Sequence, residues 1–108
     1  MDIDEKACRL NEVRALSADK VTEFLREVPE WLFKDKSIER EFQFKDFKEA
    51  MEFVNKVAAL SEADAHHPDI LISYNKVRLI LSTHKVSALS CKDFVLGAKI
   101  DLLVEKKV

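Results

Sequence analysis

Two adjacent histidines followed directly by a proline are the residues of this sequence best suited to chemistry. They are His66, His67 and Pro68. Histidine has an unperturbed pKa of about 6.5, so an imidazole can both donate and accept a proton near neutral pH. Proline disfavours the helical conformation of the residue before it, so a helix entering this segment should end at or before His67. The sequence therefore predicts two imidazoles at a helix end, where they could transfer protons.

The third histidine, His84, is expected to join this pair through a β-hairpin. Residues 70–74 and 77–83 are rich in β-branched and aliphatic side chains, and residues 75–76 separate the two runs. If those two residues form the loop, antiparallel pairing places His67 opposite His84. A longer loop would shift this register. The hairpin thus predicts three imidazoles at its open end.

Glu62 is the carboxylate expected to hold one of these imidazoles. It lies four residues before His66, which places both on one helical face, where the carboxylate could orient the imidazole or raise its pKa. A zinc site is the weaker alternative, because adjacent histidines lack the spacing that aims two imidazoles at one ion. Neither Cys8 nor Cys91 is near them in sequence. We therefore expect no metal.

Composition limits the class of protein. The 108 residues are 47% hydrophobic and 35% charged, which predicts a single small domain over residues 1–108 with its own core. The net charge of −2 comes from interspersed acids and bases, which argues against direct nucleic-acid binding. No apolar run approaches the roughly 20 residues of a membrane span, and residues 1–5 lack the features of a signal peptide. We expect a cytoplasmic protein with no membrane association and with reduced thiols at Cys8 and Cys91.

Hydrophobic spacing predicts the elements that position these residues. Ser17 precedes an i, i+3, i+4, i+7 apolar pattern that Pro29 stops, which indicates a short helix. Alternation over residues 31–44, broken near residues 36–37, predicts two antiparallel strands. The pattern from Asp46 onward lengthens to one face of a helix that should run to about His66. The predicted hairpin follows.

A final helix should run from about Cys91 to the C-terminus. Ser90 and Asp93 have the spacing of a capping box, which is the first expectation for that carboxylate. The helix carries a second apolar stripe, formed by Leu96, Ile100 and Leu103. One sheet face cannot cover both sides of such a helix, so we expect an oligomer. The order α-β-β-α-β-β-α predicts an α+β fold, a four-stranded antiparallel sheet with three helices on one face.

Four motifs link this chain to a known family. They are Glu62-x-x-x-His66-His67-Pro68, Tyr74-Asn75-Lys76-Val77, Leu81-Ser82-Thr83-His84 and Leu89-Ser90-x-x-Asp93. Shorter matches extend the likeness over nearly the whole chain; they are Ala7-Cys8-Arg9, Pro29-Glu30-Trp31 and Phe44-Lys45-Asp46-Phe47. The chain resembles the pterin-4a-carbinolamine dehydratases, the family also called dimerization cofactor of homeodomain transcription factors.

The resemblance implies a reaction that needs no cofactor. Water leaves 4a-hydroxytetrahydropterin to give quinonoid dihydropterin, which supports recycling of the tetrahydropterin used by an aromatic amino acid hydroxylase. His66 and His84 would then be the acid–base pair, with Glu62 orienting His66, and His67 would bind the pterin and help with a ring proton. Further expected pterin contacts are Pro68, Ser82, Thr83 and Asp93. The family resemblance also implies a homo-oligomer, a dimer or tetramer.

The competing hypothesis is a protein-interaction module. Members of the family also act as transcriptional partners in animals by lending a helical interface, and the last helix could serve such a role or an assembly role here. The three histidines favour the enzyme, because a pure scaffold does not need them.

Overall fold

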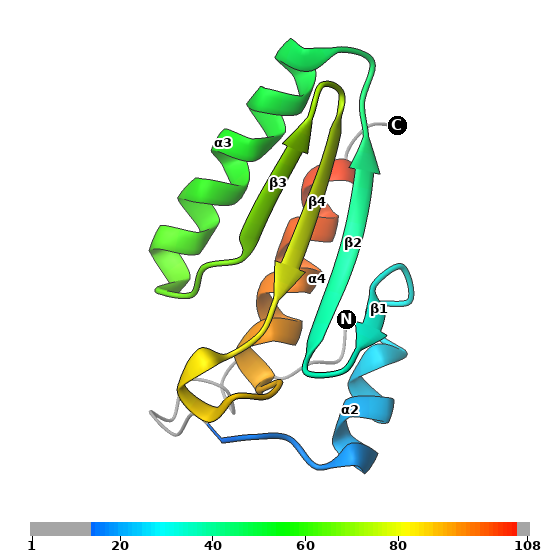
Figure 1. Cartoon of the computed structure of the whole chain (residues 1–108), viewed down its shortest axis with the longest axis vertical. Coiled ribbons are helices and arrows are strands. Elements are labelled where there is room, and N and C mark those ends of the chain that lie inside the picture. The colour runs from blue at the N-terminus through cyan, green and yellow to red at the C-terminus, as the bar shows by residue number, and fades with distance from the viewer. Residues whose placement is uncertain (1–13, 106–108) are drawn as a thin grey trace.

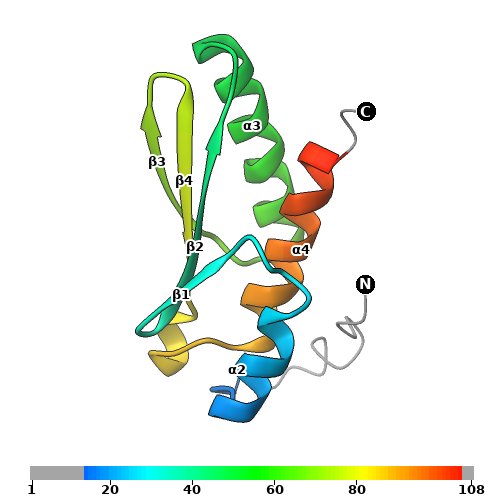
Figure 2. The same ribbon diagram turned by 90° about the vertical axis from the view of Figure 1, so that its right-hand side faces the viewer.

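The structure, a computed structural model, describes residues 14–105. Its elements in chain order are α2 (Ala18–Leu25), β1 (Leu32–Lys34), β2 (Ser37–Gln43), α3 (Phe47–Asp64), β3 (Asp69–Ser73), β4 (Lys76–Leu81), the short 3₁₀ helix η1 (His84–Val86) and α4 (Cys91–Glu105). The strands form one antiparallel sheet in the order β1-β2-β4-β3, and the α-helices lie on one of its faces (Figures 1 and 2). The predicted α+β class is confirmed. Over these residues no helix is long and apolar enough to cross a bilayer.

Side-chain caps start α2 and α3. The Ser17 hydroxyl accepts the backbone N–H of Lys20 at 3.2 Å, at the start of α2. The Asp46 carboxylate accepts the N–H of Glu49 at 2.9 Å, at the start of α3. These caps satisfy N–H groups that have no partner within the helix. Both helices therefore begin where the sequence predicts.

The C-terminal end of α3 comes earlier than expected. The helix ends at Asp64, and Ala65 adopts a left-handed conformation with φ of 52°. The N–H of His66 donates to the Ser61 carbonyl at 3.1 Å, and the N–H of Ala65 donates to the Glu62 carbonyl at 3.4 Å. This bonding pattern is a Schellman motif. The helix thus stops at Ala65, before Pro68 can act, and both adjacent histidines lie beyond it.

The β3–β4 hairpin has a different loop from the predicted one. Ser73 pairs with Lys76, so Tyr74 and Asn75 form the loop. The Asn75 carbonyl accepts the N–H of Phe44 at 2.8 Å, and the Asn75 side-chain amide donates to the Phe44 carbonyl at 2.9 Å. These two bonds hold Asn75 beside the end of β2. The predicted loop of Asn75 and Lys76 is therefore wrong by one residue.

The same register overturns the predicted pairing of His67 with His84. The ladder of β3 begins at Asp69 and that of β4 ends at Leu81, so neither histidine is a strand residue. His84 instead begins η1. Any meeting of the imidazoles depends on the two loops and not on the sheet.

α4 lies against the sheet with α2 and α3 beside it (Figure 2). At Gly97 an added Cβ would meet side-chain atoms of Trp31, Ile38 and Leu81 at 3.4–3.7 Å, so this glycine faces the sheet. The Phe94 ring packs edge-on against Phe24 of α2, with centroids 5.5 Å apart. The three neighbours bury α4 on most sides.

The predicted second apolar stripe of α4 is consequently not a free surface. Leu96 and Ile100 are fully buried, and Leu103 is half-buried against the core. Leu102, by contrast, is 48% exposed. The prediction is wrong because α2 and α3 supply partners that the sheet alone could not. The oligomer inferred from this stripe loses that basis.

The first residue of α4 carries a disulfide. Cys91 is disulfide-bonded, so the expectation of a reduced thiol is wrong at this position. Cys8 lies outside the described residues.

Candidate active site

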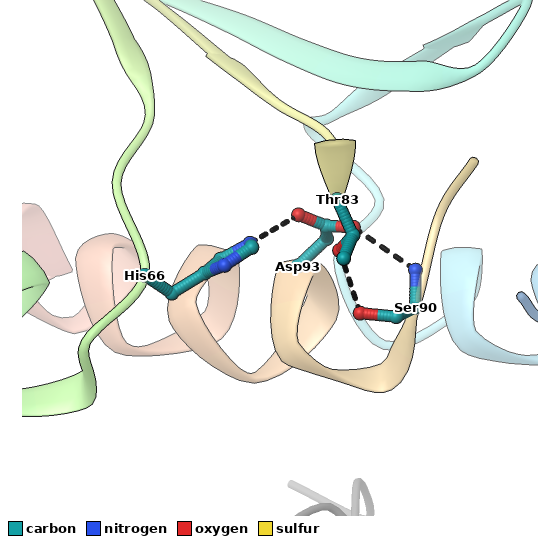
Figure 3. Close-up of polar contacts among 4 residues, drawn as sticks. All are labelled: His66, Thr83, Ser90 and Asp93. Atoms are coloured by element: carbon teal, nitrogen blue, oxygen red, sulfur yellow. Dashed lines mark hydrogen bonds and ion pairs between the residues drawn. The ribbon is translucent and has the colours of Figure 1, made fainter. Parts of the chain in front are cut away.

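A fully buried carboxylate, that of Asp93 in the first turn of α4, is at the centre of the site (Figure 3). Its Oδ1 lies 2.6 Å from Nε2 of His66. Its Oδ2 accepts the Thr83 hydroxyl at 2.7 Å and the backbone N–H of Ser90 at 3.0 Å. Burying a carboxylate is costly unless donors replace the lost water. Three donors do so here, and they also fix the orientation of the carboxylate.

The donors come from three segments that are separate in sequence. His66 follows α3, Thr83 follows β4, and Ser90 immediately precedes α4. The bond from Ser90 confirms the capping contact predicted for Asp93. The cap uses only Oδ2, so Oδ1 is left to bind His66. The capping contact was predicted from the sequence, but the bond between His66 and the other oxygen was not.

The hydrogen-bond directions hold His66 in one tautomer. An ionised carboxylate can only accept, so His66 Nε2 donates to Asp93, and a neutral imidazole then keeps Nδ1 as its acceptor. Thr83 uses its one hydroxyl proton on Asp93, so the Ser90 hydroxyl, 2.6 Å away, donates to Thr83. The His66 side chain is 12% exposed. It is therefore fixed against Asp93 but not sealed from solvent.

Glu62 lies against His67 and not against His66. Its Oε2 is 2.6 Å from His67 Nε2. The predicted contact with His66 required both residues on one helical face, and it is wrong because α3 ends at Asp64. The side chains of His67 and Glu62 are 60% and 78% exposed. Solvent screens such a pair, so it contributes little to stability.

His84 lies at the same end of the molecule, on the loop after β4. It directly follows Thr83, whose hydroxyl reaches Asp93. The backbone N–H of Thr83 donates to the Ala88 carbonyl at 2.9 Å, and Ser87 turns the chain with φ of 50°. This bridge closes the loop that presents the exposed His84 side chain. Its convergence with the other two imidazoles stays a prediction.

The remaining expected pterin contacts divide into two kinds. The polar side-chain atoms of Thr83 and Asp93 are buried. They form hydrogen bonds with one another, and also with Ser90 and His66. They support the imidazole, and their contact with a ligand stays a prediction. Pro68 and Ser82 are half-buried beside the histidines, and their contact with a ligand stays a prediction.

Proton transfer is the chemistry that this arrangement supports. An imidazole oriented by a buried carboxylate is a common general acid or base. Among residues 14–105 no group of three or more histidine, cysteine or acidic side chains is placed to hold a metal ion.

Residues 14–103 match the family model described as pterin 4 alpha carbinolamine dehydratase. A relative from Alkaliphilus metalliredigens, provisionally named a pterin-4-alpha-carbinolamine dehydratase, is 44% identical over 88 residues, covering 80% of this chain and 79% of its own. A relative from Nitrosospira multiformis with the same provisional name is 39% identical over 106 residues, covering 96% of this chain and 94% of its own.

Two solved structures are also similar to this chain. A transcriptional coactivator/pterin dehydratase from Brucella melitensis superimposes with a TM-score of 0.80 at 30% identity, covering 83% of this chain and 98% of its own. A pterin dehydratase-like RuBisCO assembly factor of the alpha-carboxysome has a TM-score of 0.57 at 24% identity, covering 68% of this chain and 84% of its own. The second likeness concerns the fold alone.

Proposed function

This chain belongs to the pterin 4 alpha carbinolamine dehydratase family, and we propose that it removes water from a 4a-hydroxytetrahydropterin to give quinonoid dihydropterin. The 4a hydroxyl must gain a proton to leave as water, and a ring N–H must lose one. Side chains that exchange protons near neutral pH suffice for both steps. The observation that carries the proposal is His66, held at 2.6 Å by the buried carboxylate of Asp93. A reductase would recycle the product for an aromatic amino acid hydroxylase.

We propose a role for each of the three histidines. We assign His66 and His84 as the acid–base pair at the 4a hydroxyl, with His66 oriented by Asp93. The more exposed His67 would bind the pterin and help remove the ring proton. Glu62 would then act on His67, its partner at 2.6 Å.

Stopped-flow measurement of carbinolamine dehydration, with and without the protein, tests the proposal. His66→Ala and His84→Ala should each lower the enzymatic rate by roughly one to three orders of magnitude, because each removes a general acid or base. His67→Ala should mainly raise KM. Wild-type kinetics in all three variants would refute the acid–base assignment.

A second candidate function is partner binding. The Brucella melitensis neighbour is described as a transcriptional coactivator as well as a pterin dehydratase. Exposed apolar side chains that a partner could cover include Leu71, Ile72 and Leu102. The histidine variants separate the two functions, because loss of dehydration should leave partner binding intact.

We also propose that the chain works in the cytoplasm as a homo-oligomer. The disulfide at Cys91 is an argument against this location, because disulfides are rare in a reducing compartment such as the cytoplasm. Alkylation of thiols in intact cells, followed by mass analysis of the Cys91 peptide, would test the location through its redox state. Protection of Cys91 from alkylation would argue against the cytoplasm.

A further inference from the structure

An ion pair joins the end of α3 to α4 close to the candidate site. Nζ of Lys99, on α4, lies 3.0 and 3.1 Å from the two carboxylate oxygens of Asp64, the last residue of α3. The two side chains are about three-quarters buried, with 26% and 22% of their surfaces exposed. Asp64 stands only two residues before His66, so the pair anchors the segment that carries this imidazole.

The charge at Asp64 is unfavourable for the helix that it ends. Carbonyl groups at a helix C-terminus carry partial negative charge, which repels a carboxylate there. Lys99 offsets this repulsion across the gap between the two helices. The arrangement therefore favours α3 docked on α4 over α3 alone.

The end of α3 and α4 are thus linked twice. One link is Asp64 to Lys99, and the other is His66 to Asp93. On α4 the two anchoring residues are six positions apart, which corresponds to about 9 Å along the helix axis. Between the links the chain turns through Ala65 in the left-handed region, a conformation that alanine disfavours. The first link restrains the direction in which the chain leaves α3 for His66.

We propose that Asp64 and Lys99 are a positioning pair for the dehydration reaction: they hold the last turn of α3 on α4 so that His66 stays on Asp93. This inference rests on the proposed function. Without the pair, the last turn of α3 would fray and a smaller fraction of molecules would keep the productive His66 orientation. The smaller productive fraction should lower kcat, and KM should stay nearly unchanged because neither residue is assigned a contact with the substrate.

Asp64→Asn and Lys99→Gln test the pair, with Arg40→Gln as the matched control. Arg40 forms an ion pair of similar burial with Asp101, at 2.6 Å, and this pair joins β2 to α4 without involving the end of α3. Each test variant should lower kcat by roughly threefold to thirtyfold, the range of coupling between residues that share a contact, with KM nearly unchanged. The control should keep kcat. The double variant Asp64→Lys with Lys99→Asp should restore kcat, because it rebuilds the pair with a favourable charge at the helix end.

Proton NMR of the His66 Nε2–H, bonded to Asp93, supplies a readout that does not depend on activity. This resonance should broaden or disappear in both single variants and persist in the control and the double variant. Its persistence in Asp64→Asn and Lys99→Gln would overturn the positioning role, even if thermal stability fell. If the wild-type protein did not dehydrate the carbinolamine, the proposed function would fail while the NMR comparison still decided the positioning.

Discussion

Asp93 serves the helix and the imidazole with its two oxygens. Oδ2 accepts the Ser90 N–H that starts α4, and Oδ1 lies on His66. One fully buried side chain makes both contacts. The imidazole of His66 is therefore held in a fixed position relative to the start of α4. Thr83 and Ser90 complete the set of donors and extend the same restraint to the loop that carries His84. At the scale of single residues, the site is built around a buried carboxylate that orients the imidazole.

Asp93→Asn should keep the fold but reverse the tautomer of His66. The amide oxygen can take over the bonds from Thr83 and Ser90, which leaves the amide N–H₂ facing Nε2 of His66. Nε2 must then accept, so Nδ1 carries the proton and is no longer a base. We expect the dehydration rate to fall by roughly 10²- to 10⁴-fold.

Glu62→Gln is the control for that variant, because this carboxylate also contacts a histidine but is exposed. Its loss of rate should be smaller than that of Asp93→Asn, because an exposed, solvent-screened carboxylate orients its histidine less firmly, and its melting temperature should barely change. Stopped-flow kinetics of both variants decides the point. Equal losses in the two variants would mean that Asp93 has no special role.

At the scale of elements, the sequence predicted what is local and missed what is not. Apolar periodicity and the Ser17 cap located the helices and strands, since both signals lie within the segments themselves. The hairpin register was missed because it depends on bonds between Asn75 and Phe44 of a distant segment. The pairing of Glu62 was missed because left-handed alanine at Ala65 ends α3, and glycine is the usual signal for that conformation.

Ala65→Gly should stabilise the protein. The left-handed conformation costs an L-residue roughly 1–2 kcal/mol but costs glycine almost nothing, although glycine gains more entropy on unfolding. We expect a net gain of up to about 1 kcal/mol, which corresponds to a rise in Tm of up to roughly 4 °C for a domain of this size. Ala63→Gly, inside the last turn of α3, should lower Tm instead. Thermal unfolding followed by circular dichroism measures both, and equal shifts would contradict the argument.

Two substitutions on α4 test how it is buried. Ile100→Glu should prevent stable folding, because the carboxylate would be buried among apolar groups with no partner. Leu102→Glu, two residues further on, should fold normally since that side chain is 48% exposed. Urea unfolding of both variants gives the comparison. If the Ile100→Glu protein folded stably, the second apolar stripe of α4 would have to be exposed and not buried.

At the scale of the whole molecule, the apolar surface suited to self-association shifts from α4 to the sheet. Leu71 and Ile72 on β3 are exposed, and so is Tyr74 in the adjoining loop. Within the described residues β3 pairs with β4 alone, so its other side is an edge of the sheet (Figure 1). Such an edge presents unpaired N–H and C=O groups to another chain. Edge-to-edge pairing therefore replaces the α4 stripe as our basis for an oligomer.

Ile72→Lys should lower the mass of the assembly in analytical ultracentrifugation at tens of micromolar. Leu71 and Ile72 are 46% and 41% exposed, so burying what remains exposed in two chains would contribute only roughly 1 kcal/mol per side chain, and new backbone hydrogen bonds would add to this. These terms are of the size needed to offset the loss of about 4–15 kcal/mol in translational and rotational freedom. A lysine on an edge strand opposes the pairing.

Leu102→Glu distinguishes an interface at the β3 edge from an interface on α4. If that variant were the smaller species and Ile72→Lys kept the wild-type mass, the interface would lie on α4. A monomeric wild-type protein would remove the oligomer altogether. His66, Thr83, Ser90 and Asp93 all come from one chain, so the Ile72→Lys protein should keep the His66–Asp93 hydrogen bond whatever its mass. A dehydration rate that fell with the mass while this bond persisted would show that association adds something to the site beyond the contacts made within one chain.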